Sequence, residues 1–338
     1  MSERSSRMST FLVGLLFSLI VTVLVVPRLR DWFKKIKVAQ MVMRTGEHEP
    51  DHAAKAGTPT MGGAGFIPVV VIGFIILALI TKNTSSTGWA TLIAIVVFAI
   101  VGAFDDSIKV FNHRDEGLRF LPKLFAEIAA AILGVVVLAL GKFDFFLSLP
   151  FGLGEWHSVI VYTLFTIFWL VGWSNATNLT DGLDGLASGT AIIAYVAYLV
   201  IAIVQGDMTM VLLDGLMIGA LLGFMFFNHY PATIFMGDTG SLALGAGLAM
   251  NSLVLHHEWS ILIIGFVFMV ETLSVIIQVT SFHFFKKRIF LMTPIHHSFE
   301  KGGLTGNTEK PWNEWQVNFF FWGIGLIMAV IYLLIWFL

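Results

Sequence analysis

Ten apolar segments, each about the length of a membrane-spanning helix, take up most of this sequence. A helix needs about 20 mostly apolar residues to cross the hydrocarbon core of a bilayer. The composition agrees, because 57% of the residues are hydrophobic and only 12% are charged. The sequence therefore predicts an all-α integral membrane protein, a bundle of ten transmembrane helices in a single polytopic domain over residues 1–338. The segments lie at approximately 10–26, 64–81, 88–104, 121–140, 157–174, 187–204, 209–227, 241–255, 260–282 and 318–338.

The eighth segment differs from the others because it is short and rich in glycine and alanine. Small residues let helix backbones approach closely inside a membrane, so we expect 241–255 to pack against other helices rather than against lipid. The first segment follows Arg4 and Arg7, as the apolar part of a signal peptide would. It lacks a small-residue cleavage site, and we interpret it as a retained anchor.

Most of the 20 lysine and arginine residues lie in the loops that follow the odd-numbered segments. Cytoplasmic loops carry an excess of these residues, so we predict that these loops are cytoplasmic and that both termini are extracytoplasmic. On the outer side, residues 142–156 predict two short strands around Pro150 and Gly152. The net charge of −2 gives no reason to expect nucleic acid, and the absence of cysteine excludes disulfides and thiolate metal sites.

Five polar motifs fall in or beside the predicted cytoplasmic loops. If the helices form a bundle, these motifs can converge on one site at the cytoplasmic face, at the depth of the lipid headgroups. The motifs are "HAAKAGTPTMGG", "GAFDDSIKVF", "NATNLTDGLDG", "NHYPATIFMGDTGS" and "LMTPIHHSFEKGG".

Asp105 and Asp106 stand where the third segment is predicted to end. Neighbouring residues on a helix point about 100° apart, so we expect the two carboxylates to have separate roles rather than to form one clamp. The alternative is an ordinary solvated helix end.

In the third motif, Asn175, Asn178, Asp181 and Asp184 recur every three residues. A helical or 3₁₀ segment would present much of this set on one side. Gly182 lies among them and would let a ligand approach the backbone closely. The alternative is a capped turn between two spans, although a cap needs only one such residue.

Asp238 lies beside two glycines and could bind a ligand or merely cap the eighth helix. His296 and His297 lack the partners of a zinc site, so phosphate contact or proton transfer is the better interpretation. Clustered carboxylates repel one another unless a cation neutralises them, and oxygen ligands suit Mg²⁺ shared with substrate phosphates. The motifs predict phosphoryl-type transfer between a lipid phosphate and a soluble nucleotide, driven by positioning and charge neutralisation.

Taken in order, "KAGTPTMGG", "AFDDSIK", "NATNLTDGLDGLA", "FMGDTGSLALG" and "MTPIHHSFEKGG" resemble the bacterial phospho-N-acetylmuramoyl-pentapeptide transferase family, within the polyprenyl-phosphate hexosamine-1-phosphate transferases. The resemblance covers nearly the whole chain. It implies Mg²⁺-dependent transfer of phospho-MurNAc-pentapeptide from UDP-MurNAc-pentapeptide to undecaprenyl phosphate, which yields lipid I and UMP in peptidoglycan synthesis. It also implies a homodimer in the bacterial cytoplasmic membrane that nucleoside antibiotics inhibit.

By matching position, the resemblance implies separate roles for four residues. Asp105 would deprotonate or orient the lipid phosphate, and Asp106 would support the metal and phosphate site. Asp238 would be the principal Mg²⁺ ligand, and His296 would be required for activity. The same resemblance implies a substrate site, in which Phe235 stacks on uracil, formed by Lys55, Thr60, Lys109, Lys123, Asn175, Asn178, Asp181, Gly182, Asp184, Asn228, Phe235 and His297.

Ser298 departs from the family pattern, which has a third consecutive histidine at this position. A serine carries no charge, so the role of a third histidine in phosphate binding does not transfer to this chain. Two alternative functions remain. A related transferase of N-acetylglucosamine-1-phosphate would share the aspartate motifs, whereas a secondary transporter would place ionisable residues near the bilayer midplane. Glu271, inside the ninth segment, fits a transporter, a helix bend or a pairing across the bundle.

Overall fold

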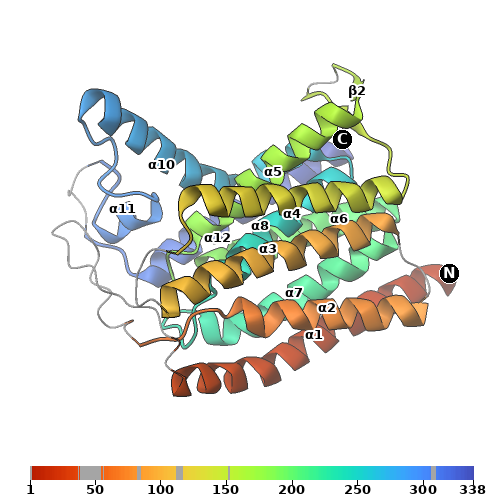
Figure 1. The fold of residues 1–338 in the computed structure, drawn as a ribbon, viewed down its shortest axis with the longest axis horizontal. Coiled ribbons are helices and arrows are strands. Elements are labelled where there is room, and N and C mark those ends of the chain that lie inside the picture. The colour runs from red at the N-terminus through yellow and green to blue at the C-terminus, as the bar shows by residue number, and fades with distance from the viewer. Residues whose placement is uncertain are drawn as a thin grey trace.

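The computed structural model describes residues 2–36, 38, 55, 57–81, 85–111, 117–150, 153–305 and 310–338. Within these ranges the regular structure is helical apart from one two-stranded hairpin (Figure 1). In chain order the elements are α1 (Ser2–Lys35), α2 (Gly63–Thr81), α3 (Ser86–Phe111), α4 (Phe120–Leu140), β1 (Phe146–Ser148), β2 (Glu155–His157), α5 (Val159–Thr180), α6 (Leu186–Gln205), α7 (Met208–Asn228), α8 (Gly237–Val254), η3 (Glu258–Ser260), α9 (Ile261–Ile264), α10 (Phe266–Phe285), α11 (His296–Glu300) and α12 (Glu314–Phe337).

Nine of the described helices are long and apolar enough to cross a membrane, which confirms the predicted class of all-α integral membrane protein. They are α1 to α7, α10 and α12. Helix α8 corresponds to the eighth predicted span but is not among these nine. Every residue from Asp238 to Val254 is buried, and α8 packs most extensively against α3 and α5. The expectation that this segment contacts protein rather than lipid is confirmed.

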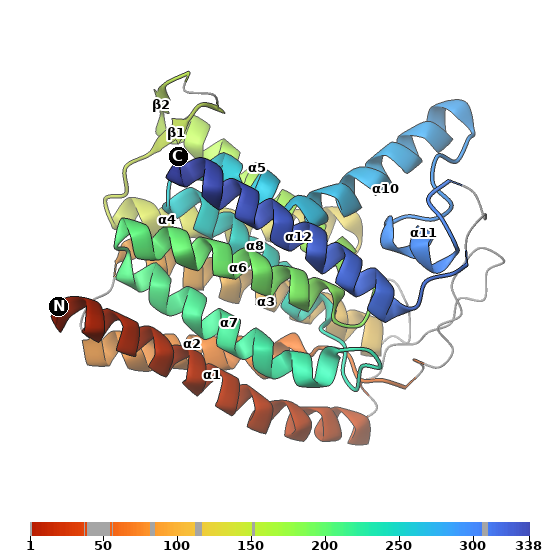
Figure 2. The same cartoon turned by 180° about the vertical axis from the view of Figure 1, so that it is seen from behind.

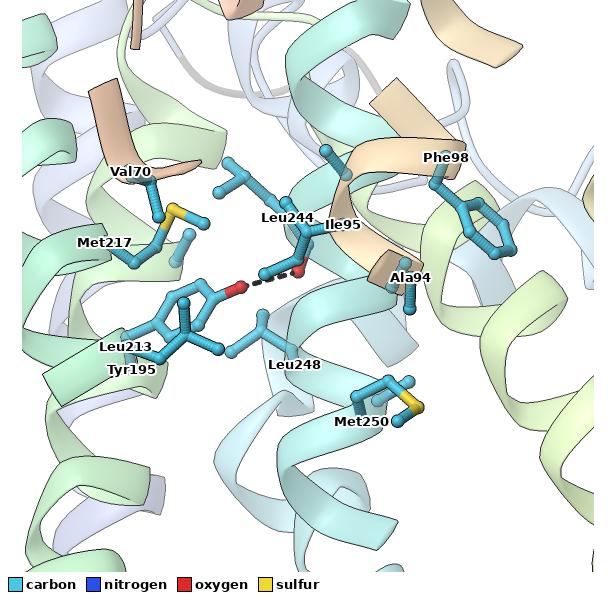
Figure 3. Packing of buried hydrophobic residues seen from close by; sticks show 14 of the residues in the cluster. Val70, Ala94, Ile95, Phe98, Tyr195, Leu213, Met217, Leu244, Leu248 and Met250 are labelled. Carbon is cyan, nitrogen blue, oxygen red and sulfur yellow. Dashed lines mark hydrogen bonds between the residues drawn. The ribbon is translucent and has the colours of Figure 1, made fainter. Parts of the chain in front are cut away.

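Helix α8 forms the centre of the bundle, surrounded by side chains from several other helices (Figure 3). Val70, Ile95 and Met217 reach this core from α2, α3 and α7, and all three are buried. The hydroxyl of buried Tyr195 donates a hydrogen bond of 3.1 Å to the carbonyl of Leu244. This bond matters because a buried hydroxyl without a partner costs free energy.

The ninth predicted span is interrupted in the structure. The sequence predicts one helix over 260–282, but the chain forms η3 and the short α9 before a break at Gly265 and then α10. A Cβ atom at Gly265 would lie 2.7 Å from the carbonyl oxygen of Ile261 and 2.9 Å from the Trp173 ring, so this close packing requires glycine. After the break, α10 projects away from the other helices, and α11 lies beside it (Figure 2).

The predicted hairpin is confirmed, with Phe146 opposite His157 and Ser148 opposite Glu155 in an antiparallel pair. Gly152 lies outside the described residues. Trp259 donates a hydrogen bond of 2.6 Å to the carbonyl of Ser148, which fastens the hairpin to η3. The hairpin and both chain termini lie at one end of the bundle, and α11 lies at the opposite end (Figures 1 and 2).

Candidate active site

Helices α3 and α8 approach closely at the end of the bundle where α11 lies. A Cβ atom at Gly102 would lie 2.1 Å from the carbonyl oxygen of Asp238, so the first turn of α8 can reach α3 only because residue 102 has no side chain. The next turn of α3 carries Asp105 and Asp106. The sequence placed both aspartates at the end of the helix, but α3 continues to Phe111, because α8 covers this turn.

Asp106 holds the N-terminus of α8. One carboxylate oxygen accepts a hydrogen bond from the backbone N–H of Asp238 at 3.1 Å. The other oxygen accepts two, from the backbone N–H of Thr239 at 2.9 Å and from its hydroxyl at 2.6 Å. The first N–H groups of a helix have no partner within the helix, and a negative charge there is stabilising. Asp106, rather than Asp238, therefore caps α8.

Asp105, Asp238 and two lysines form a continuous chain of ion pairs. The ammonium group of Lys109 lies 2.7 Å from an oxygen of Asp105 and 3.0 Å from an oxygen of Asp238. Lys123, in α4, lies 3.0 Å from the other oxygen of Asp238. Asp105 also accepts a hydrogen bond of 2.8 Å from the backbone of Leu118. Asp105 and Asp106 thus contact different partners, as their separation around the helix predicts.

The Asp238 carboxylate is held ionised. Burial alone would raise its pKa, but the ammonium groups of Lys109 and Lys123 hold the pKa of Asp238 well below its usual range. Asn178, in α5, donates a hydrogen bond of 2.9 Å to the same carboxylate. An ionised carboxylate is the form that binds cations, whether a lysine ammonium group or a metal ion.

A second cluster joins Lys55, Asp184 and Glu314. The ammonium group of Lys55 lies 2.8 Å from Asp184 and 2.8 Å from Glu314. Burial disfavours the charge on Lys55, but these two carboxylates prevail and raise its pKa. Asp184 also accepts a hydrogen bond of 2.8 Å from the backbone of Ala232. Sequence reasoning missed Glu314, although it stands just before the last apolar segment.

A third cluster lies on α11. His296 and Ser298 are fully buried, and His297 is mostly buried with its Nδ1 atom 2.6 Å from Glu300. The Nε2 atom of His296 faces Gly182, where a Cβ atom would lie only 2.4 Å away. The hydroxyl of Ser298 donates to the carbonyl of Met292 at 2.6 Å and accepts from its N–H at 3.1 Å. Ser298, the departure from the family pattern, therefore holds the loop before α11.

The backbone of Phe235 is fixed by the segment before α2. The N–H of Phe235 donates to the carbonyl of Pro59 at 2.8 Å, and the carbonyl of Phe235 accepts from the N–H of Gly62 at 2.8 Å. Asn228 is buried and accepts a hydrogen bond of 2.7 Å from Ser188, while its amide donates to the carbonyl of Ile234. Its contacts are with protein, so Asn228 supports the Phe235 loop. The ring of Phe235 is half-buried.

Thr60, predicted for the substrate site, is buried beside the start of α8. A Cβ atom at Gly237, which has a positive φ of 71°, would lie 2.9 Å from the Thr60 hydroxyl and 2.7 Å from Asp106. Glycine is the residue that adopts this backbone conformation without steric cost. The segment before α2 thus lies directly against the acidic cluster.

The last turn of α5 and the turn that follows it connect the three clusters. Asn178 contacts Asp238, Gly182 faces His296, and Asp184 pairs with Lys55. Burial, with Asp238 nearby, raises the pKa of the Asp181 carboxyl well above its usual range. The expectation that a helical or 3₁₀ segment presents much of this set on one side holds only as far as Thr180, where α5 ends, and the four residues contact different partners. The predicted convergence of the motifs is nevertheless observed.

Asn175 does not join this turn. Its amide donates a hydrogen bond of 2.8 Å to Glu127 of α4, a residue that sequence reasoning missed. The other oxygen of Glu127 is buried and has no hydrogen-bond partner among the described residues. An acidic residue within a predicted membrane span was the available signal for Glu127.

No group of three or more histidine, aspartate or glutamate side chains within the described ranges is arranged to hold a metal ion unaided. Mg²⁺, however, is usually bound by one or two carboxylates together with substrate phosphates and water. Lys109 shows that a positive charge is stabilised between Asp105 and Asp238. The carboxylate oxygens therefore fit an Mg²⁺ ion that shares its coordination with a substrate.

Known proteins resemble this chain over most of its length. The profile described as Glycosyl transferase family 4 matches residues 88–256. The phospho-N-acetylmuramoyl-pentapeptide-transferase of Limosilactobacillus reuteri is 46% identical over 94% of this chain and 94% of its own length. The chain belongs to this transferase family. The protein of the same name from Leuconostoc mesenteroides is 44% identical over 92% of this chain and 94% of its own length. The one from Streptococcus pneumoniae is 45% identical over 94% of this chain and 96% of its own length.

Membership of the transferase family decides between the classes that the sequence left open. The chain is a multi-pass membrane transferase rather than a secondary transporter. The clusters described above lie within or beside the residues matched by the profile, except for Lys55 and the α10–α12 region. The relatives align with more than nine-tenths of the chain, so their match extends well beyond the residues of the profile.

Proposed function

We propose that this chain transfers phospho-MurNAc-pentapeptide from UDP-MurNAc-pentapeptide to undecaprenyl phosphate, forming lipid I and UMP. The observation that carries the proposal is the alternating cluster of Asp105, Lys109, Asp238 and Lys123 at one end of a membrane bundle. Such a cluster can bind a diphosphate with its lysines and a metal ion with its carboxylates. The names of the relatives supply the sugar and peptide.

In the proposed reaction, an oxygen of the lipid phosphate attacks the sugar-linked phosphorus of the donor. The bond from this phosphorus to the bridging oxygen breaks, and UMP leaves with that oxygen. Asp105 accepts any proton that the lipid phosphate carries and orients the attacking oxygen. Lys109 and Lys123 neutralise charge on the diphosphate, so positioning and electrostatics supply most of the rate enhancement.

Asp238 would hold Mg²⁺ through a carboxylate oxygen, with Asp105 close enough to share the ion. The ion would neutralise charge on the phosphates of the donor. Asp106 does not need to touch the ion, because both of its oxygens are engaged by α8. Its role is to keep Asp238 in place.

The nucleotide part of the donor is assigned to the surface between the α5–α6 turn and the Phe235 loop. Asp181, Gly182 and Phe235 border this surface, with Phe235 stacking on uracil and His297 close to Gly182. Lys55 and Asp184 fix the turn from the other side. Nucleoside antibiotics would compete for the same surface. The enzyme would act in the bacterial cytoplasmic membrane as a homodimer, with this face in the cytoplasm and both termini outside.

The deciding experiment is reconstitution of the purified protein with UDP-MurNAc-pentapeptide and undecaprenyl phosphate. We expect formation of lipid I and UMP in equal amounts, lost with EDTA and restored by Mg²⁺. The matched control replaces the donor with UDP-N-acetylglucosamine. Product from this sugar alone would assign the chain to the related N-acetylglucosamine-1-phosphate branch, and a rate independent of metal would contradict the role of Asp238.

A further inference from the structure

Glu271 is a fully buried carboxylate in α10, and it faces His296 on α11. Both side chains have 0% exposure. One oxygen of Glu271 lies 3.1 Å from Nδ1 of His296 and 3.4 Å from the backbone nitrogen of the same residue. A charged residue buried in a membrane helix is costly unless it is paired. Among the described residues, His296 is the ionisable group that pairs with Glu271.

Charge balance fixes where the protons of this pair lie. A buried pair is most stable with zero net charge, either as a carboxylate with an imidazolium or as a carboxylic acid with a neutral imidazole. In the first form both ring nitrogens carry a proton. In the second, the acid donates to Nδ1, so the ring proton lies on Nε2. Both forms therefore make Nε2 of His296 a hydrogen-bond donor, and only a pair with a net negative charge would not.

The Nε2 atom faces the turn that connects the three clusters of the site. Neither ring nitrogen of His296 has a geometrically aligned hydrogen-bond partner among the described residues, but Nδ1 has the Glu271 carboxylate at 3.1 Å, whereas Nε2 has no charged group beside it. Gly182 leaves room for it, since a Cβ atom there would lie 2.4 Å away. Buried donors are nearly always paired, and an N–H group at this position can donate to a phosphate oxygen that binds over the turn.

The neighbouring histidine has a carboxylate partner of its own. Nδ1 of His297 lies 2.6 Å from Glu300, and the two imidazole rings have centroids 4.1 Å apart. The carboxylates of Glu271 and Glu300 therefore bind two different rings. The turn beside Gly182 also carries Asp181, whose charged neighbours are Asp238, Asp106 and Asp184. The pair formed by Glu271 is distinct because both of its members are fully buried.

We infer that Glu271 is a positioning residue for the proposed transfer: it holds His296 with a proton on Nε2, so that this ring donates a hydrogen bond to a phosphate oxygen of the nucleotide donor. The inference rests on the proposed function for the identity of the ligand. The protonation of His296 follows from the pair and from the zero net charge that its burial favours. It also gives Glu271 a role that requires neither transport nor a helix bend.

The first test measures the protonation directly. The full-length protein is labelled with ¹⁵N-histidine in detergent micelles, and the His296 signals are assigned by their loss in His296→Gln. We expect Nε2 of His296 to give the signal of a protonated ring nitrogen in the wild-type protein, without any substrate. An unprotonated Nε2 would overturn the inference, and this result does not depend on activity.

The second test uses Glu271→Gln, which keeps the shape of the side chain. Its amide oxygen should occupy the position that faces the backbone N–H of His296, and it then accepts from Nδ1. The neutral ring consequently loses the proton on Nε2. We expect kcat/KM for UDP-MurNAc-pentapeptide to fall by about 10- to 100-fold, as when a carboxylate that orients a metal-bound histidine is removed. Most of the loss should be in kcat, and Glu271→Asp should recover part of it.

The matched control is Asp214→Asn, which neutralises another fully buried carboxylate, in α7, that bonds to Asn251 rather than to the site. Its kcat/KM should stay within about twofold of wild type. A Glu271→Gln protein with wild-type kcat/KM would contradict the inference. A loss of activity with Nε2 of His296 still protonated would also contradict it, because the role of Glu271 would then be structural. If Glu271→Gln does not fold, the wild-type spectrum decides alone. If the wild-type protein forms no lipid I, the proposed function fails, while the spectrum still tests the pair.

Discussion

Replacing Asp106 with asparagine should destabilise the protein through the N-terminus of α8. The carboxylate accepts three hydrogen bonds, of 3.1, 2.9 and 2.6 Å, from Asp238 and Thr239. Asparagine offers one acceptor oxygen, and its NH₂ group would face a backbone N–H donor. A lost charged cap costs about 0.5–2 kcal/mol, and a buried unpaired N–H costs about 1–3 kcal/mol. We therefore expect the free energy of unfolding to fall by about 2–4 kcal/mol.

The assay for Asp106→Asn is SDS-induced unfolding in mixed micelles, followed by the fluorescence of the 10 tryptophans. Two control variants separate the contributions. Thr239→Val removes only the hydroxyl bond and should cost about 1 kcal/mol. Asp105→Asn leaves the cap intact, so it should cost less than Asp106→Asn while lowering kcat more strongly through loss of the base.

The reasoning about Asp106 would be refuted by an inactive Asp106→Asn protein whose unfolding free energy differs from wild type by less than about 0.5 kcal/mol. That result would show that the carboxylate acts on the substrate or the metal ion rather than on α8. A phosphorylated enzyme trapped by acid quench, with the lipid withheld, would instead make one of the adjacent aspartates the nucleophile.

Three further predictions concern single positions. Asp238→Asn should lower kcat by about 100-fold or more, with partial recovery in excess Mg²⁺; near wild-type turnover at low Mg²⁺ would exclude it as the ligand. If the Phe235 ring stacks on a base, Phe235→Ala should weaken nucleotide binding by about 1–3 kcal/mol. The KM for the nucleotide should then rise while the KM for the lipid stays the same. Equal increases in both KM values would indicate that the ring has a structural role. Burial, with His256 nearby, lowers the pKa of His257 from 6.5 to about 4. As the pH drops, His257 is therefore protonated in the unfolded chain before it is protonated in the folded protein. The free energy of unfolding should consequently fall as the pH drops from about 6.5 to about 4. His257→Gln should flatten that pH dependence, and an unchanged dependence would disprove the assignment.

The sequence predicted the parts of the site that depend on topology. Because the positive loops lie on one side, the motifs had to share one end of the bundle, and the contact between Asn178 and Asp238 confirms this for α5 and α8. The separate partners of Asp105 and Asp106 followed from helix geometry alone. Both results use only helix periodicity, the order of the spans and the positions of the charged loops.

The parts that could not be predicted depend on tertiary contacts. The hydropathy of the ninth segment is continuous, so the break at Gly265 depends on the Trp173 ring packed against it. Glu314 and Glu127 lie far along the chain from Lys55 and Asn175, and no local pattern links them. The length of α3 was underestimated because charged residues normally end a span, whereas here α8 covers them.

The burial of α8 also has a consequence for how the protein reaches its membrane. The helix with Asp238 in its first turn is not among the nine apolar enough to span a bilayer, and its glycines leave little side chain to dissolve in lipid. Such a helix gains little free energy by entering the bilayer alone, and contacts with other helices retain it there. We expect α8 to depend on α3 and α5, its main neighbours, already being in place. Membrane integration of α8 and assembly of the acidic cluster would then be one event, so that a partly inserted chain carries no partly active site.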